Sequence, residues 1–435
     1  MFKTLRPSCY LQFDEQLCSG CTHCVRECPT CAIRIRNGIE VRIAGHCIAC
    51  GECIVVCPTG ALRGTPGGLD LDVPNQIPVA VLSPVLYSQF PWVDPRDVHR
   101  GLRALGFRYT LDLSEYIELF QRATKAYIRR NRAEASHPWP LVSPVCPAVI
   151  RLIAFQFRGL LPNVLPFLRP TTLLAREVRK RLNRIHGIGE NSNRRVVLYH
   201  LTPNRSYLPR EQGCFDRVIG LNDVYPDLYK QIAHPDNRPE SGKPKRQRPF
   251  FISANCLAWG ASGGEVAGLD LDHTLHISGL SETIAYLQKL ELGQFRNIEY
   301  IEFRICPGGC IGGKHAAIDK YLAKNAILKM AGQCTTARSV SDEKVERLYN
   351  AGWFLDASIV RNENHLSHQP PDPLSLEAVS EINRLLDIFP GIDCGACGAP
   401  DCRTLAEDIV REQAGIDDCL MYRSYLSGRA HGESQ

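Results

Sequence analysis

The sequence lacks any apolar run long enough to cross a bilayer, and the first residues, Met1 to Pro7, lack the apolar core of a secretory signal. These absences exclude a helical membrane protein and a typical leader-directed one. We therefore expect a cytoplasmic protein without membrane insertion. With 435 residues, 44% of them hydrophobic, the chain can form about three folded domains with buried cores.

The sequence also has little net charge for its length. The excess of +5 comes from basic residues interspersed with acidic ones, which argues against nucleic acid as a partner. Two basic clusters stand out, at residues 243–248 and 176–184. Each can be read as solvated surface, or as a docking patch for an acidic electron-transfer partner.

Cysteine, by contrast, is abundant, with 20 residues in the chain. In a reducing compartment, closely spaced cysteines are more typical of metal ligands than of disulfides. The question is therefore how these thiols are grouped.

The first group is a duplicated run of four cysteines, the last of each run followed by proline. The spacing matches bacterial two-cluster ferredoxins, in which the fourth cysteine of one run ligates the other cluster. A pair of zinc sites is the alternative, and Cys9 and Cys31 fall outside the pattern as ordinary small apolar residues. The predicted ligand sets are Cys18, Cys21, Cys24 and Cys57 for one four-iron cluster, and Cys47, Cys50, Cys53 and Cys28 for the other.

The middle of the chain alternates strand-like and helix-like segments. Strands are expected at 76–84, 195–200, 217–220 and 301–305, and a helix at 95–105. This alternation predicts an α/β domain with mainly parallel sheets and helices on both faces. Ligands in such folds lie at the carboxyl ends of strands, where Cys306 and Cys310 stand. By spacing alone, Cys146 is equally well read as a ligand or as a structural residue.

The last cysteine group stands near the end of the chain. A helix from Cys402 to Arg411 could carry Cys402 away from the preceding loop and bring Cys419 back at its far end. Four thiolates suit a further four-iron cluster, with zinc as the alternative. Residues 233–249 are expected to form an exposed loop, and residues 367–373 a linker. The predicted ligands are Cys394, Cys397, Cys402 and Cys419.

Residues 75–330 resemble the iron-only hydrogenases, whose catalytic domain holds a four-iron cubane joined through a cysteine to a two-iron unit. Cys306 to Gly313 matches the third motif of that family, Cys146-Pro147 the end of the first, and Leu198 to Asn204 lies where the second is expected. The C-terminal cysteines resemble a tail found on sensory hydrogenases. The resemblance implies a domain order of 1–75, two-cluster ferredoxin-like; 76–385, hydrogenase-like α/β; and 386–435, small, helical and iron-sulfur binding.

The departures from the family pattern concern its chemistry. Asn204 stands where the second motif has a cluster-ligating cysteine, and Val145 where active enzymes carry a proton-relaying cysteine. The lysine and glutamate of the second motif fall at Tyr207 and Arg210, although Glu211 is adjacent. A valine has no titratable proton, and losing one proton relay typically costs about two to four orders of magnitude in rate. Ordinary hydrogen turnover is therefore not expected, and no catalytic residue can be assigned.

Three thiolates remain to hold a central four-iron cluster: Cys146, Cys306 and Cys310. The fourth iron could take Cys256, Asn204, water or a substrate, although Cys256 reads more readily as a buried apolar thiol than as a ligand. Lys314 and His315 are candidates to lie beside this cluster, or could face solvent. A two-iron subcluster is therefore not expected.

The leading hypothesis is a hydrogenase-like iron-sulfur protein that is degenerate for hydrogen turnover and acts in electron transfer or redox sensing. Its partner would be a ferredoxin, flavoprotein or reductase. The alternatives are a divergent hydrogenase or hydrogen sensor with a two-iron unit, a reductase using an open cluster iron, and an iron-sulfur assembly factor.

Overall fold

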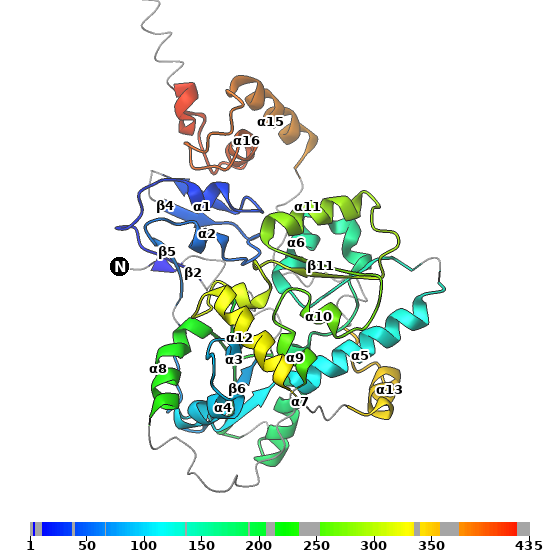
Figure 1. Cartoon of the computed structure of the whole chain (residues 1–435). Helices are drawn as coiled ribbons and strands as arrows, with labels where there is room; N and C mark the ends of the chain where they lie inside the picture. The colour runs from blue at the N-terminus through cyan, green and yellow to red at the C-terminus, as the bar shows by residue number, and fades with distance from the viewer. Residues whose placement is uncertain are drawn as a thin grey trace, which may run out of the picture. The chain divides into compact units, whose positions relative to one another are not determined.

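The computed structural model describes residues 3–4, 11–36, 40–65, 67–134, 137–189, 192–205, 214–234, 253–334, 340–356 and 374–423. The chain forms two compact units: Met1–Thr65 together with Ser367–Gln435, and Pro66–Leu366. Figure 1 shows the elements of each. The second motif beyond Arg205 and the expected segments at 235–249 and 367–373 lie outside the described residues.

The N-terminal part of the first unit is built from two similar halves. Strands β1 (Lys3–Thr4), β2 (Leu11–Phe13) and β5 (Leu62–Gly64) form one antiparallel sheet, and β3 (Ile33–Arg36) pairs with β4 (Glu40–Ile43) in another. Each cysteine run contains one short helix, α1 (His23–Arg26) or α2 (Glu52–Val55). Both helices are entered through a left-handed residue, Thr22 with φ 61° and Gly51 with φ 81°.

The C-terminal part of this unit is helical. It contains α15 (Leu376–Ile388), α16 (Cys402–Val410) and the 3-10 turn η5 (Ile416–Asp418). The observed α16 matches the helix expected from Cys402. A small apolar core joins the two helices and reaches Cys419; its buried members include Ile382, Leu385, Phe389, Leu405 and Ala406.

The second unit contains two fully parallel sheets. The larger has the order β10-β9-β6-β7 and the smaller the order β11-β12-β8. The strands are β6 (Gln76–Leu82), β7 (Tyr109–Asp112), β8 (Leu141–Val142), β9 (Arg195–Thr202), β10 (Arg217–Gly220), β11 (Thr274–Ser278) and β12 (Tyr300–Arg304).

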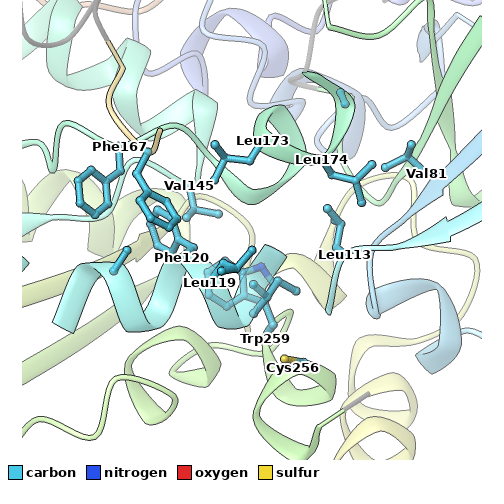
Figure 2. Packing of buried hydrophobic residues seen from close by; sticks show 14 of the residues in the cluster. Val81, Leu113, Leu119, Phe120, Val145, Phe167, Leu173, Leu174, Cys256 and Trp259 are labelled. Carbon is cyan, nitrogen blue, oxygen red and sulfur yellow. The ribbon is translucent and has the colours of Figure 1, made fainter. Parts of the chain in front are cut away.

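Strand β6 shows why helices cover both faces of the larger sheet. Its residues Val79 and Val81 enter one apolar core, while Ala80 and Leu82 enter another, because successive side chains point to opposite faces. The helices α5 (Ser114–Asn131) and α7 (Pro170–Ile185) contribute to the first core, seen in Figure 2. The α/β class with mainly parallel sheets is therefore confirmed.

The remaining helices complete this unit. The second core is lined by α3 (Val85–Ser88), α4 (Pro95–Ala104), α8 (Leu221–Ala233) and α12 (Lys320–Gln333). The others are α6 (Pro147–Gln156), η1 (Arg158–Asn163), α9 (Ala254–Ala258), α10 (Gly264–Ala267), α11 (Leu280–Glu291), η4 (Cys310–Gly312) and α13 (Asp342–Asn350). None of the described helices is long and apolar enough to span a bilayer.

Candidate metal centres

The structure brings the N-terminal cysteines together in the two crossed sets. Burial raises the pKa of the Cys24 thiol to about 12, and the charges of Cys57, Cys18 and Cys21 add to the rise. Cys57 belongs to the second run, so the last thiol of that run lies among the first three of the other. The converse holds for Cys53, whose pKa is raised well above its ordinary value by burial and then by Cys50, Cys47 and Cys28.

Backbone amides also serve these thiols. The N–H of Ala32 donates to Cys28 Sγ at 3.3 Å. Burial raises the pKa of Cys57, but hydrogen bonds from Leu62, Thr59 and Ala61 outweigh it and leave the pKa below its ordinary value. Donors of this kind stabilise the thiolate that an iron cluster requires.

Three of the four C-terminal cysteines are grouped around Cys397. Burial raises the pKa of Cys397, and the charges of Cys419 and Cys394 add to it. Cys402 opens α16, and its N–H donates to Asp393 Oδ1 at 2.8 Å. Cys419 follows η5 and is buried.

In the second unit, three cysteines converge where strands of the smaller sheet end. Strand β12 leads to Cys306, and the parallel neighbour β8 leads to Cys146, which precedes α6. Burial raises the pKa of Cys306 to about 12, and the charges of Cys310 and Cys146 add to the rise. Parallel strands explain the convergence, because their carboxyl ends share one edge.

Asn204, at the end of β9, is the fourth residue at this site. Its Nδ2 donates to Cys306 Sγ at 3.2 Å. The asparagine therefore occupies the neighbourhood where the resemblance places a ligating cysteine. An amide cannot supply a thiolate, so three thiols face this centre together with one amide.

Two glycines of the Cys306 loop lie against the backbone of neighbouring segments. A Cβ on Gly309 would lie 2.5 Å from Ser262 N, and one on Gly313 would lie 2.3 Å from Pro203 O. These glycines allow the loop to pack against neighbouring backbone. Only at Gly308, whose φ is +79°, does an added Cβ meet nothing within 4 Å.

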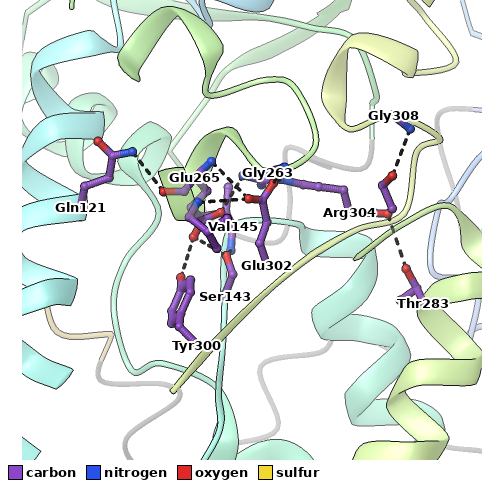
Figure 3. Close-up of polar contacts among 12 residues, drawn as sticks. Gln121, Ser143, Val145, Gly263, Glu265, Thr283, Tyr300, Glu302, Arg304 and Gly308 are labelled. Atoms are coloured by element: carbon purple, nitrogen blue, oxygen red, sulfur yellow. Dashed lines mark hydrogen bonds and ion pairs between the residues drawn. The ribbon is translucent and has the colours of Figure 1, made fainter. Parts of the chain in front are cut away.

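Sequence reasoning missed a buried charged network that joins β12, the strand before Cys306, to α10 (Figure 3). Arg304 Nη2 donates to Glu265 Oε2 at 2.6 Å and Arg304 Nε to Glu302 Oε1 at 3.1 Å. Glu265 also accepts from Tyr300 and Ser143, at 2.5 Å and 2.8 Å. Burial raises the pKa of Glu265 to about 7, against the opposing charge of Arg304. Two charges inside the apolar run Ile301 to Ile305 were the available signal.

The charge of Arg304 also interacts with two of the three thiols, those of Cys310 and Cys146. Burial raises the pKa of Cys310 to about 11, and the strongest opposing effect is the positive charge of Arg304. Its Nη1 is buried and has no hydrogen-bond acceptor among the described atoms. An arginine with a buried N–H, charged beside Cys310 and Cys146, suits an anionic group such as an iron-sulfur cluster, whose sulfides accept hydrogen bonds. The residues present therefore fit a cluster at this centre.

The remaining predicted residues divide into two groups. The positive charge of Lys314 lowers the pKa of Cys306, which places it near the centre. His315 is buried, and its backbone N–H donates to Pro203 O at 2.8 Å. Burial lowers the pKa of its imidazole to about 4. Cys256 lies in the apolar core instead, with Sγ 3.3 Å from the carbonyl oxygen of Ser114, and Val145 is packed in the same core (Figure 2).

A zinc site requires a different spacing of thiols from a four-iron cluster, because all four thiolates bind one ion. Four thiolates on one Zn²⁺ lie about 3.8 Å apart, from a Zn–S distance of about 2.3 Å. Within the part of the chain that the structure describes, no three His, Cys, Asp or Glu side chains form a group that could hold a single metal ion.

Three family models match the chain. A 4Fe-4S dicluster domain matches residues 10–58, the C-terminal domain of the iron-only hydrogenase large subunit matches 76–198, and an Fe-S cluster family matches 389–421. No curated protein matches the sequence significantly.

Solved structures share the fold at low identity. One FeFe-hydrogenase, studied for oxygen inactivation through its 2Fe subcluster, is 15% identical, with a TM-score of 0.51 over 66% of this chain and 95% of its own. A variant of HydA1 from Chlamydomonas reinhardtii is 16% identical, with a TM-score of 0.49 over 64% of this chain and 90% of its own.

These matches, with the grouped thiols, define an iron-sulfur protein that contains a 4Fe-4S dicluster domain. More particularly, residues 76–198 match the iron-only hydrogenase large subunit, and the chain shares its fold with a solved FeFe-hydrogenase.

Proposed function

We propose that this protein transfers single electrons, or senses redox state, through several four-iron clusters and does not turn over hydrogen at an ordinary rate. The observation that carries the proposal is the central site: three converging thiols, with Asn204 donating to Cys306 where a fourth thiolate is expected. The intact cysteine sets at both ends of the chain support it.

The residues have separate roles in this proposal. Cys146, Cys306 and Cys310 would hold the central cluster, and the two N-terminal sets and the C-terminal set would each hold one more. Such clusters, when bound, accept and donate one electron at a time. Burial raises the pKa of most of these thiols, so cluster binding must displace their protons.

Val145 supports the absence of hydrogen chemistry. It is 6% exposed, belongs to the apolar core and directly precedes Cys146, so it offers no proton donor next to that thiol. The redox partner would be a ferredoxin, flavoprotein or reductase, acting in the cytoplasm.

Infrared spectroscopy of anaerobically purified protein, with iron counting, tests the proposal. We expect no carbonyl or cyanide bands and about sixteen irons, four for each of four cubanes. Bands of those ligands with about eighteen irons would contradict it and favour a two-iron unit.

Two substitutions locate the central cluster. Cys310→Ser should remove four irons, leaving about twelve. Cys256→Ser is the matched control, because Cys256 interacts with Ser114 in the core, and it should leave the iron count unchanged. Loss of four irons in the control would instead make Cys256 the fourth ligand.

A second candidate function is a reductase whose substrate binds the iron lacking a thiolate. The specific observation in its favour is Arg304, whose buried Nη1 could donate to an anionic substrate there. A change in the central paramagnetic signal on adding cyanide, lost in Cys310→Ser, would support this reading.

A further inference from the structure

The C-terminal cysteine segment is built onto the ferredoxin-like part within one compact unit. Ile35, on the free edge of β3, donates its N–H to Gly398 O at 2.9 Å. Arg36 Nη1 donates to Cys397 O at 3.1 Å, and Arg26 donates to Cys394 O. Two of these three carbonyls belong to predicted ligands, so the contacts fix the ligand loop itself.

A buried ion pair fixes α16 in the same way. Asp408 Oδ2 lies 2.5 Å from both Arg34 Nε and Arg36 Nη2, and Asp408 Oδ1 lies 3.2 Å from Arg34 Nη2. The Asp408 side chain is only 6% exposed. We call Asp408, Arg34 and Arg36 the clamp. Separating these residues would leave a buried charge without its partner, so the clamp favours a single geometry.

Cys31 connects the two cysteine groups. Its N–H donates to Cys28 O at 3.0 Å, and its Sγ lies 4.0 Å from Asp401 Oδ2. Asp401 caps α16 and directly precedes Cys402. We expected Cys31 to be an ordinary apolar residue, but it has a carboxylate neighbour, and burial raises its pKa to about 11 with added effects from Asp401 and Cys28.

The contact therefore runs from a ligand of one N-terminal set to a ligand of the C-terminal set. His46 Nε2 lies 3.4 Å from Cys31 O and precedes Cys47, a second member of that N-terminal set. The N-terminal set at this contact is the one formed by Cys28, Cys47, Cys50 and Cys53.

We propose that the C-terminal centre exchanges electrons directly with the ferredoxin-like centre held by Cys28, Cys47, Cys50 and Cys53. This inference rests on the proposed function and names the route within this unit. One electron leaves one centre, which is oxidised, and reaches the other, which is reduced, with no bond made or broken. The electron enters from a one-electron donor protein of the class proposed above.

Paramagnetic resonance on the anaerobic full-length protein tests this route. During stepwise reduction with dithionite, we expect the C-terminal signal to split or relax faster when the ferredoxin-like centre becomes reduced. The Cys402→Ser variant identifies the C-terminal signal by its loss. Two reduced signals that stay unsplit and relax independently would overturn the inference.

The outcomes separate this inference from the proposed function. If iron counting shows no cluster at the C-terminal cysteines, the route fails, and the proposed function rests on the other clusters. If the cluster is present but magnetically isolated, only the route fails.

Asp408→Asn should loosen the clamp and reduce the magnetic interaction, with the cluster count retained. Glu407→Gln is the matched control, since Glu407 pairs with Arg403 within α16 at 3.2 Å. If the magnetic interaction between the two centres is equal in Asp408→Asn and in wild type, the clamp does not determine their coupling. If Asp408→Asn does not fold, the wild-type measurement still decides.

Discussion

Asn204 is the residue on which the central site depends. Its side chain already reaches Cys306 Sγ at 3.2 Å, so a thiol at this position would lie beside the other three. Replacing an amide by a thiolate gives iron a ligand that it prefers.

Asn204→Cys should therefore hold the central iron more tightly. We expect iron loss to a chelator to slow severalfold at the central site, because the fourth iron gains a protein ligand. Asn204→Ser is the control, since serine supplies no thiolate. Iron loss at the wild-type rate in Asn204→Cys would contradict the placement of residue 204.

Arg304 gives a second prediction at the residue scale. Arg304→Gln leaves Glu265 and Glu302 buried without the cation that pairs with them. It should destabilise the second unit by about 3–5 kcal/mol. Adding Glu265→Gln removes one of the stranded charges and should recover part of the loss. Anaerobic thermal unfolding followed by circular dichroism measures both, and additive effects would show that the two residues are not coupled.

At the scale of elements, the C-terminal ligand loop packs against the edge of β3 at Gly398. A Cβ there would lie 1.7 Å from Ile35 O, closer than any packed atoms can stand. The backbone of Gly398 also has φ +75°, which L side chains rarely adopt.

Gly398→Ala should therefore separate the C-terminal segment from β3 and speed hydrogen exchange at the Ile35 amide. Gly391→Ala is a matched control, because Gly391 has φ +64° but nothing within 4 Å of its added Cβ. The control carries only the backbone cost of about 1–2 kcal/mol. Equal exchange in the two variants would mean that the close approach at Gly398 is not important.

Much at the scale of elements could be predicted from the sequence. The strand expected at 217–220 is β10 without change, and the helix expected at 95–105 is α4 at Pro95–Ala104. Local periodicity decides such elements. The pairing of Asp408 with Arg34 spans 374 residues and leaves no local pattern, so the sequence alone did not indicate it. The same is true of the partners of Gly309 and Gly313.

At the scale of the whole molecule, one compact unit is formed by both ends of the chain. Ending the chain after residue 366 would remove Asp408 and leave Arg34 and Arg36 without their carboxylate. We expect the truncated protein to lose N-terminal iron to a chelator faster than the full chain, with the central site unchanged. Equal rates at the N-terminal site would show that the clamp does not support the ferredoxin-like part.

The central site was predictable in its thiols and not in its surroundings. The resemblance already indicated Cys146, Cys306 and Cys310 as ligands, and the structure places the charges of Cys146 and Cys310 beside Cys306. The ion network of Glu265, Glu302 and Arg304 depends on how two strands and α10 meet, which spacing along the chain does not specify.

The clamp also has a consequence for synthesis on the ribosome. Arg34 emerges 374 residues before Asp408, an interval of roughly 20–75 seconds at about 5–20 residues per second. During that time the outer edge of β3 has no covering segment, and an uncovered strand edge invites pairing with other chains. Two arginines on this short strand discourage such pairing, so the side chains that later bind Asp408 would first protect the nascent ferredoxin-like fold from aggregation.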